Sequence, residues 1–277
     1  MKLLRGFWIA IWVILLTVLT QVGGLLYLLW LPIGRAIQKH NPRRLVAYGW
    51  RLFGFLAFYS LCTVAVVPIL AQLSGREPLP VFYTEDLPLQ PRTYLTCFMN
   101  RHYVKPELKL AVLVEARALK LRDPGFQMTY LDANFPFMNG FPLLPHRSHR
   151  DGKKLDLAFL YKDQEGRRLS TTPSWVGYGA FEAPGPKEFD QVSLCINQGY
   201  WRYDLTRFLH FWPRSQRYVF DEAGTRRLLE ALSANPKIGK IFLEPHLKTR
   251  LGLGGYDKIR FHGCGSTRHD DHIHIQL

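Results

Sequence analysis

Two long uncharged segments near the start of the chain restrict its fold more than any other feature. The first is apolar over residues 7–31 and the second over residues 52–73. A helix of about 20 apolar residues crosses the hydrocarbon core of a bilayer, so both segments are long enough to span a membrane. We therefore predict a transmembrane hairpin within residues 1–75.

A cleaved signal peptide and a buried core helix are the alternatives to two membrane spans. Lys2 and Arg5 precede the first segment, as they would in a cleaved signal peptide. However, the segment is longer than the roughly 7–15 residues of a signal core, and no small-x-small cleavage site ends it. The second segment could be a buried core helix. The pairing of the two segments across a short loop favours the membrane hairpin.

Basic residues predict the orientation of this hairpin. Most of those near the spans lie in the connecting loop: Arg35, Lys39, Arg43, Arg44 and Arg51. Lys and Arg favour the cytoplasmic side of a membrane, so we expect the loop in the cytoplasm and both chain ends outside. In a bacterium with two membranes, the hairpin would lie in the inner membrane and residues 76–277 in the periplasm.

The net charge of +14 limits the classes of partner. A basic surface is typical of proteins that meet nucleic acid, anionic lipid or an acidic polymer. The sequence contains no helix-turn-helix or RNA-binding signature, so no nucleic-acid partner is expected. An outward-facing domain would instead meet an anionic cell wall or lipid head groups.

Four cysteines give little information on their pairing. Cys62 lies inside the second apolar segment, whereas Cys97, Cys195 and Cys264 lie in the polar part of the chain. Three cysteines allow at most one disulfide, and its pairing stays open. None has CxxC spacing, so a zinc site made of thiolates is not expected.

Residues 76–95 are rich in proline and are interpreted as a linker, followed by a domain over residues 96–277. Apolar periodicity predicts a helix over Glu107–Leu121, and Asp221 is a suitable N-cap for a helix that reaches Leu232. Extended segments are predicted around residues 126–135, 155–161, 238–244 and 272–275. This loose alternation indicates an α+β domain with a mainly antiparallel sheet.

Five of the ten histidines fall in two short windows. His146 and His149 form the first window, and His269, His272 and His274 form the second. The other histidines, including His102, His210, His246 and His262, are interpreted as ordinary.

The two windows together indicate a metal site. Asp151-Gly152 is a strong tight-turn signal, and a turn there lets His149 and Asp156 approach each other. In a strand, His272 and His274 point to the same face. Imidazole and carboxylate are both good zinc ligands, and three protein ligands leave a fourth position for water. Taken singly, each window would be a surface feature more often than a ligand set.

These residues resemble a known family. The pattern Ser148-His149-x-x-Gly152-x-x-x-Asp156, followed by His272-x-His274, resembles that of the LAS-type zinc peptidases, which share a fold with D-Ala-D-Ala carboxypeptidases and the hedgehog signalling domain. His146 and the ending His269-x-x-His272-x-His274 are similar to the penicillin-insensitive murein endopeptidases in particular. The resemblance covers roughly residues 126–277.

The resemblance implies a zinc peptidase domain of the hedgehog/D-Ala-D-Ala-peptidase type. It implies that His149, Asp156 and His274 bind Zn²⁺, and that His146 lines the site or binds a second metal. It implies catalytic roles for His269 as general base and for His272 as a group that stabilises the oxyanion. The implied substrates are peptidoglycan stem peptides, hydrolysed at cross-bridge amide bonds next to D-amino acids.

The chain departs from the family in several respects. Lys153, Lys154 and Leu155 replace the small or acidic residues usual before the aspartate, and the family's several disulfides cannot form here. The known endopeptidase is secreted without membrane spans. The alternatives are therefore a D,D-carboxypeptidase or another peptidase of the same fold, or a zinc-stabilised module that binds the cell wall without hydrolysis.

Overall fold

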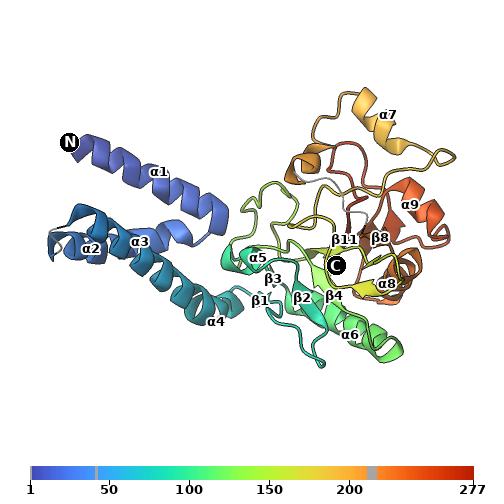
Figure 1. The fold of residues 1–277 in the computed structure, drawn as a ribbon, viewed down its shortest axis with the longest axis horizontal. Coiled ribbons are helices and arrows are strands. Elements are labelled where there is room, and N and C mark those ends of the chain that lie inside the picture. Colours follow the sequence, from blue (N-terminus) through green and yellow to red (C-terminus); the bar gives the residue numbers. More distant parts are fainter. Residues whose placement is uncertain (1, 41–42, 211–216) are drawn as a thin grey trace.

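The computed structural model describes residues 2–40, 43–210 and 217–277. A group of N-terminal helices extends from one side of a mixed α+β domain (Figure 1). The helices of the first part are α1 (Lys2–Thr20), α2 (Gly23–His40), α3 (Arg44–Leu61) and α4 (Val67–Leu73), with a short π-helical segment, Cys62–Val66, between the last two.

Two helical segments in the described part of the chain are long and apolar enough to cross a membrane, namely Leu3–Thr20 and Arg44–Leu73. The second agrees with the predicted span over residues 52–73. The first does not agree with one continuous span over residues 7–31, because the chain reverses after α1. This assignment follows from the length and composition of the two helical segments.

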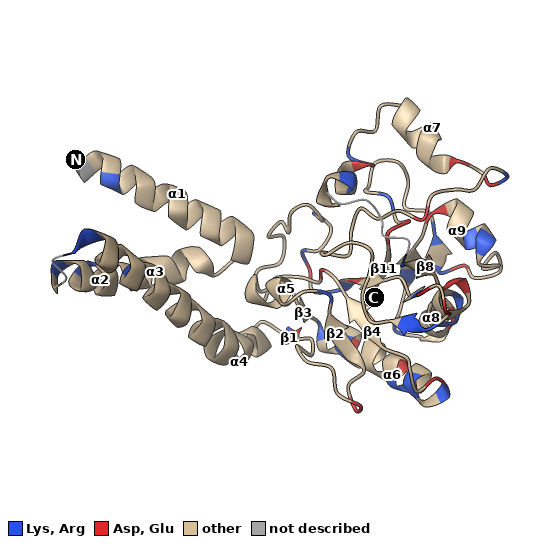
Figure 2. Ribbon diagram, viewed as in Figure 1, with Lys and Arg blue, Asp and Glu red and all other residues tan. Residues whose placement is uncertain are grey.

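The reversal takes place at Gln21, whose φ is 66°. Glycines at the start of α2 let it pack tightly against α1, since a Cβ on Gly24 would lie only 2.0 Å from the Thr17 side-chain oxygen. The N-terminal end of α1, the C-terminal end of α2 and the N-terminal end of α3, which carry Lys and Arg, consequently lie at the same end of the helices, away from the domain (Figure 2). The predicted hairpin differs from this arrangement, because it has the N-terminus and the segment between the two spans on opposite sides of the membrane.

A six-stranded sheet forms the centre of the domain, in the order β10-β9-β11-β5-β4-β2. Its strands are β2 (Leu89–Pro91), β4 (Met128–Tyr130), β5 (Lys154–Ala158), β9 (Lys240–Phe242), β10 (Ile259–Arg260) and β11 (His272–Gln276). The four inner strands pair antiparallel, but β10 and β2 each run parallel to their neighbour. The sheet is thus mixed, with antiparallel pairing between its four inner strands and parallel pairing at both edges.

Smaller elements surround this sheet. The remaining helices are α5 (Tyr94–Phe98), α6 (Pro106–Arg122), α7 (Gln191–Asn197), α8 (Glu222–Ala234), α9 (Pro245–Arg250) and a 3₁₀ segment (Leu205–Leu209). The remaining strands are β1 (Glu77–Pro78) with β3 (Tyr103–Val104), and β7 (Arg168–Leu169), β6 (Tyr161–Lys162) and β8 (Val219–Phe220) in a three-stranded sheet.

The hydrophobic core joins helices α6 and α8 to the central sheet. The predicted helices are confirmed, and the Asp221 side chain accepts a hydrogen bond from the Gly224 backbone N–H as the N-cap of α8. Leu228 and Leu232 of α8 lie in the same buried cluster as Ile273 and Ile275 of β11. The core therefore fixes the inner face of the strand that carries His272 and His274.

Residues 76–95, expected as a linker, are part of the domain. Strand β2 pairs with β4, and Leu79 and Leu89 are buried in the core. Arg76 is only 1% exposed, and its guanidinium donates to the carbonyl of Phe135 and to the side chain of Asn139. The domain thus begins directly after α4.

Candidate metal centre

Strands β5 and β11 place two acid–base side chains opposite each other. In the antiparallel register, His274 faces Asp156 and His272 faces Ala158. Because side chains alternate along a strand, His272 and His274 share one face while Ile273 and Ile275 enter the core. The alternation predicted for this strand is confirmed, and the strand ladder gives the site a rigid base.

The third side chain comes from the segment before β5. Gly152 has a φ of 79°, a conformation that favours glycine, and its N–H donates to the Asn134 side chain. The turn brings His149 against the strands, where its Nδ1 donates to the Ala133 carbonyl at 2.6 Å. This bond fixes the ring so that Nε2 points to Asp156 and His274.

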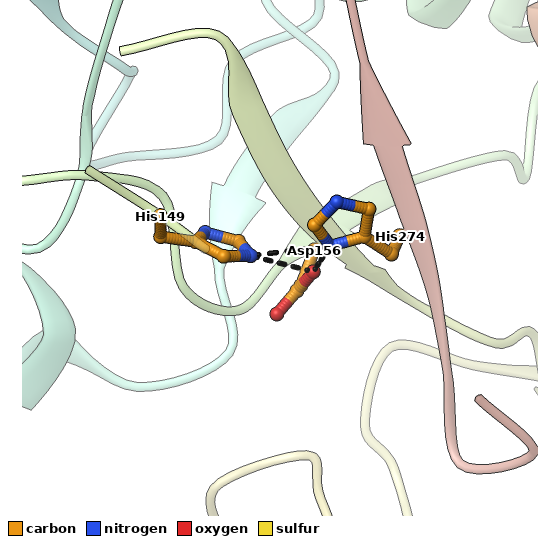
Figure 3. A group of neighbouring side chains, drawn as sticks. All are labelled: His149, Asp156 and His274. Atoms are coloured by element: carbon orange, nitrogen blue, oxygen red, sulfur yellow. Dashed lines mark hydrogen bonds and ion pairs between the residues drawn. The ribbon is translucent and has the colours of Figure 1, made fainter. Parts of the chain in front are cut away.

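His149, Asp156 and His274 form one buried group (Figure 3). Their facing atoms all lie within 4.8 Å of one another. His149 Nε2 lies 3.2 Å from both Asp156 Oδ1 and His274 Nδ1, and His274 Nδ1 lies 2.8 Å from Asp156 Oδ1. None of the three residues is more than 3% exposed. Two imidazole nitrogens and a carboxylate oxygen that converge in this way can hold a metal ion.

A second layer of hydrogen bonds fixes Asp156. Its other oxygen, Oδ2, accepts a hydrogen bond from the Tyr178 hydroxyl at 2.7 Å, and the same hydroxyl accepts one from the Asp132 N–H. Burial would raise the pKa of Asp156, but the neighbouring His149 and His272 hold it well below its usual value. The carboxylate is therefore kept ionised and oriented, as a metal ligand must be.

His146 lies beside the ligand group and is not part of it. Its Nδ1 is 3.0 Å from Asp132 Oδ2, and Arg101 holds the same carboxylate with two further bonds. The ring is 5.7 Å from that of His149. Its Nε2 is buried and has no hydrogen-bond partner among the described residues. The structure thus supports its predicted place at the site, but not a ligand role in the same group.

His272 and His269 line the other side of the ligand group. His272 Nδ1 contacts the Asp271 carboxylate, and its Nε2 is 3.8 Å from Asp156 Oδ1. Burial lowers the pKa of His272, but Asp156 and Asp271 outweigh this and raise it to about 9. The ring of His269 lies 5.0 Å from that of His272. Burial first, and then the neighbouring His272 and His274, hold the pKa of His269 well below its usual value.

The backbone of His269 is fixed by a buried glutamate. Glu244, the second residue after β9, accepts hydrogen bonds from the His269 N–H at 2.9 Å and from the Tyr203 hydroxyl at 2.5 Å. Burial raises the pKa of Glu244. The strand-to-helix step at Glu244–Pro245 therefore connects the site to the segment that follows α7.

A cavity of about 820 Å³ opens over this group. Besides the site histidines and Asp156, it is lined by residues of three loops, including Leu144, Arg147, Arg150, Trp201, Arg202, His262 and Ser266. The disulfide Cys195–Cys264 joins α7, which precedes the loop of Trp201 and Arg202, to the loop that carries His262 and Ser266. The expectation of at most one disulfide among the three domain cysteines is confirmed, and Cys97 is free.

The sequence did not identify several residues of the site. His262 was interpreted as ordinary, yet its ring lies 5.9 Å from that of His269 at the cavity wall. Tyr178 and Asp132 carry no spacing signal, because each reaches the site from a separate loop or strand end. For Asp271, which precedes His272 in the chain, adjacency to the His-x-His pattern was the only available signal.

Comparison with known proteins adds no assignment: no protein-family model matches the chain, and no curated protein matches it significantly.

Proposed function

We propose that this protein is a membrane-anchored, zinc-dependent endopeptidase that hydrolyses the cross-bridge peptides of peptidoglycan. The observation that carries the proposal is the buried group of His149, Asp156 and His274, with two further histidines beside it under a substrate-sized cavity. The motif that resembles the murein endopeptidases supports the same reaction.

The donor set fits Zn²⁺. Two histidines and one carboxylate are ligands typical of catalytic zinc sites, which keep one position open. The His149 Nδ1 bond to a carbonyl is the outer contact that orients such ligands. When bound, zinc polarises a scissile carbonyl and lowers the pKa of water.

We assign proton transfer to His269 and stabilisation of the oxyanion to His272. His269 lies in the cavity beside His272 and His274 and accepts the proton of the attacking water, which it then passes to the leaving amine. His272, held by Asp271, donates a hydrogen bond to the oxygen on which negative charge develops. Both roles follow from the position of the rings around the ligand group.

The charge of the cavity favours an anionic substrate. Arg147, Arg150 and Arg202 line it, whereas the only carboxylate in its lining is Asp156, which already faces four histidines. Within the described residues, none of these arginines forms an ion pair with a carboxylate. Peptides that carry free carboxylates, as stem peptides do, complement this lining.

Location outside the cytoplasm completes the proposal. The basic ends of the helices lie away from the domain (Figure 2), and Lys and Arg favour the cytoplasmic side. The Cys195–Cys264 disulfide is typical of oxidising compartments. We therefore place the domain in the periplasm and the helices in the inner membrane.

The test uses the full chain in detergent with purified cross-linked muropeptide dimers, analysed by mass spectrometry. We expect conversion of dimers to monomers, loss of that activity with a chelator, and its recovery with zinc. His269→Ala should retain stoichiometric zinc while it loses activity. Intact dimers from zinc-loaded protein would contradict the proposal.

The same experiment separates the alternatives. Release of single D-alanine from monomers would identify a D,D-carboxypeptidase of the same fold. Zinc-dependent retention on sacculi without any cleavage would identify a wall-binding module.

A further inference from the structure

The domain contacts the side of the anchor helices as well as following them in the chain. The hydroxyl of Tyr59 in α3 donates to the Phe98 carbonyl at 2.7 Å and accepts from the Asn100 side chain at 3.0 Å. The rings of Tyr59 and Phe98 are 4.9 Å apart. At the α1–α2 reversal, the Gln21 side chain accepts the Phe137 N–H at 2.9 Å. These contacts fix one edge of the domain against the helices.

The apolar helix continues well past this contact. From Tyr59 to Leu73 it extends for about 21 Å at 1.5 Å per residue. Its outward side chains along this length remain apolar and exposed, with Val64 at 76%, Ile69 at 65% and Leu73 at 84%. Such a surface is stable in lipid and unfavourable in water. The domain edge beside Tyr59 therefore adjoins a length of helix whose outer side fits lipid, and so borders the bilayer.

This edge exposes large apolar side chains. Tyr94, Leu95 and Phe98 share one face of α5, as residues three and four apart do, and are 62%, 41% and 38% exposed. In the segment that follows Phe137, Met138 is 60% and Leu144 is 52% exposed. We call these five residues the membrane-facing surface. Exposed apolar groups gathered in this way mark an interaction site.

The charges around this surface favour a lipid partner. Residues 136–150, which contain two of its members, include no Asp or Glu but do include the exposed Arg147 and Arg150. Aromatic side chains concentrate at membrane interfaces, and basic residues are attracted to anionic lipid. A soluble protein partner would not explain why the surface adjoins the apolar helix.

We propose that the membrane-facing surface lies in the head-group layer of an anionic phospholipid bilayer. The same segment then connects lipid to the metal centre, because Leu144 lines the cavity and His146 follows two residues later. The cavity mouth is thereby held close to the membrane plane, where it meets substrates near or attached to the bilayer. This inference rests on the proposed membrane anchoring and is independent of peptidase activity.

The test measures lipid contact at two labelled positions in the full chain. In a Cys62→Ala, Cys97→Ala background, Met138→Cys is labelled with an environment-sensitive fluorophore without reducing the disulfide. The protein is then reconstituted into phosphatidylcholine–phosphatidylglycerol vesicles, with or without a nitroxide on the lipid chains. Gly255→Cys is the matched control, since a Cβ there meets no atom within 4 Å and the position follows α9, which lies far from the helices (Figure 1).

We expect a blue-shifted emission and strong quenching by the lipid-borne nitroxide at position 138, and neither at position 255. Equal, water-like emission at both positions in protein that resists carbonate extraction would overturn the inference while leaving the anchor intact. Release of the protein by carbonate would overturn it by removing the anchor itself. Zinc content and peptidase activity, measured on the same samples, show separately whether the proposed function holds.

Discussion

The floor and the wall of the cavity are held in different ways. The floor consists of Asp156, His272 and His274 on strands β5 and β11, where the backbone ladder and the core behind it set every position. The wall consists of residues 185–209 and 261–269, where short elements are joined by the Cys195–Cys264 disulfide and by ion pairs such as Arg250–Glu188. Metal binding should therefore depend on the floor, and the shape and stability of the cavity on the wall.

Loss of a floor ligand should have the largest effect on the metal. We expect His274→Ala to weaken zinc binding by more than about 100-fold, since changes to groups that only support ligands already cost 10–100-fold. Metal content of the purified protein and competitive titration with a zinc chelator would measure this. The matched control is His40→Ala, an exposed histidine at the end of α2, which should bind zinc like the unmodified chain. Stoichiometric zinc in His274→Ala would show that the floor is not the metal site.

Removal of the disulfide should act on the wall and spare the floor. The bridge spans 69 residues, and a loop of that length corresponds to about 4 kcal/mol of stabilisation in the chain-entropy description. The variant Cys195→Ser, Cys264→Ser should unfold at lower denaturant concentration but keep its zinc at room temperature. In turnover, KM should rise more than kcat falls, because Trp201 and Arg202 lie in the loop that the bridge restrains.

The control for this variant is Cys62→Ala, which removes a free thiol outside the domain. Its denaturation midpoint and zinc content should match those of the unmodified chain. If instead the disulfide variant lost its zinc in proportion to its stability, the floor and wall would form a single cooperative unit, and the distinction between them would fail.

The sequence predicted the floor better than the wall for a physical reason. His272-Ile273-His274-Ile275 alternates polar and core residues, so its strand and its shared face follow from a period of two. Asp151-Gly152 likewise requires a turn, which brings His149 toward Asp156. In contrast, no local sequence pattern predicts the hydrogen bond between Tyr203 and Glu244, because only the folded chain brings these two residues together. The choice of Cys264 as the partner of Cys195 was similarly open.

The N-terminal helices also show that composition predicts an apolar segment but does not predict how the chain folds within it. Hydropathy identified apolar residues 7–31 but could not place the reversal at Gln21, because a turn between two packed apolar helices leaves the composition unchanged. The signal was local and easily overlooked, since Gln21 precedes the glycine pair that permits the close packing of α2 on α1. Proline-rich residues 76–95 were instead predicted to lie outside the domain, although they form part of it. Their prolines occur at the ends of the short strands β1 and β2 and next to them.

The smallest effect is expected from one ion pair of the wall. Glu188 accepts hydrogen bonds from Arg250, at 2.5 Å, and from the Gly185 N–H. The Arg250 guanidinium is the main reason that the pKa of Glu188 falls to about 2. Glu188→Gln should lower the free energy of unfolding by roughly 0.5–1 kcal/mol at pH 7, since partly exposed ion pairs contribute little.

The sign of the pH dependence makes this small effect testable. Because the pKa is lowered on folding, the carboxylate stabilises the fold at pH values above its unfolded pKa near 4.5, and this contribution is lost as the pH falls toward 2. The stability difference between Glu188→Gln and the unmodified chain should therefore shrink across that interval. Denaturation of both proteins after removal of metal avoids the separate loss of zinc in acid. A difference that stayed constant down to pH 2 would mean that Glu188 supports the wall by its shape and hydrogen-bond geometry, and that charge has no part in holding it.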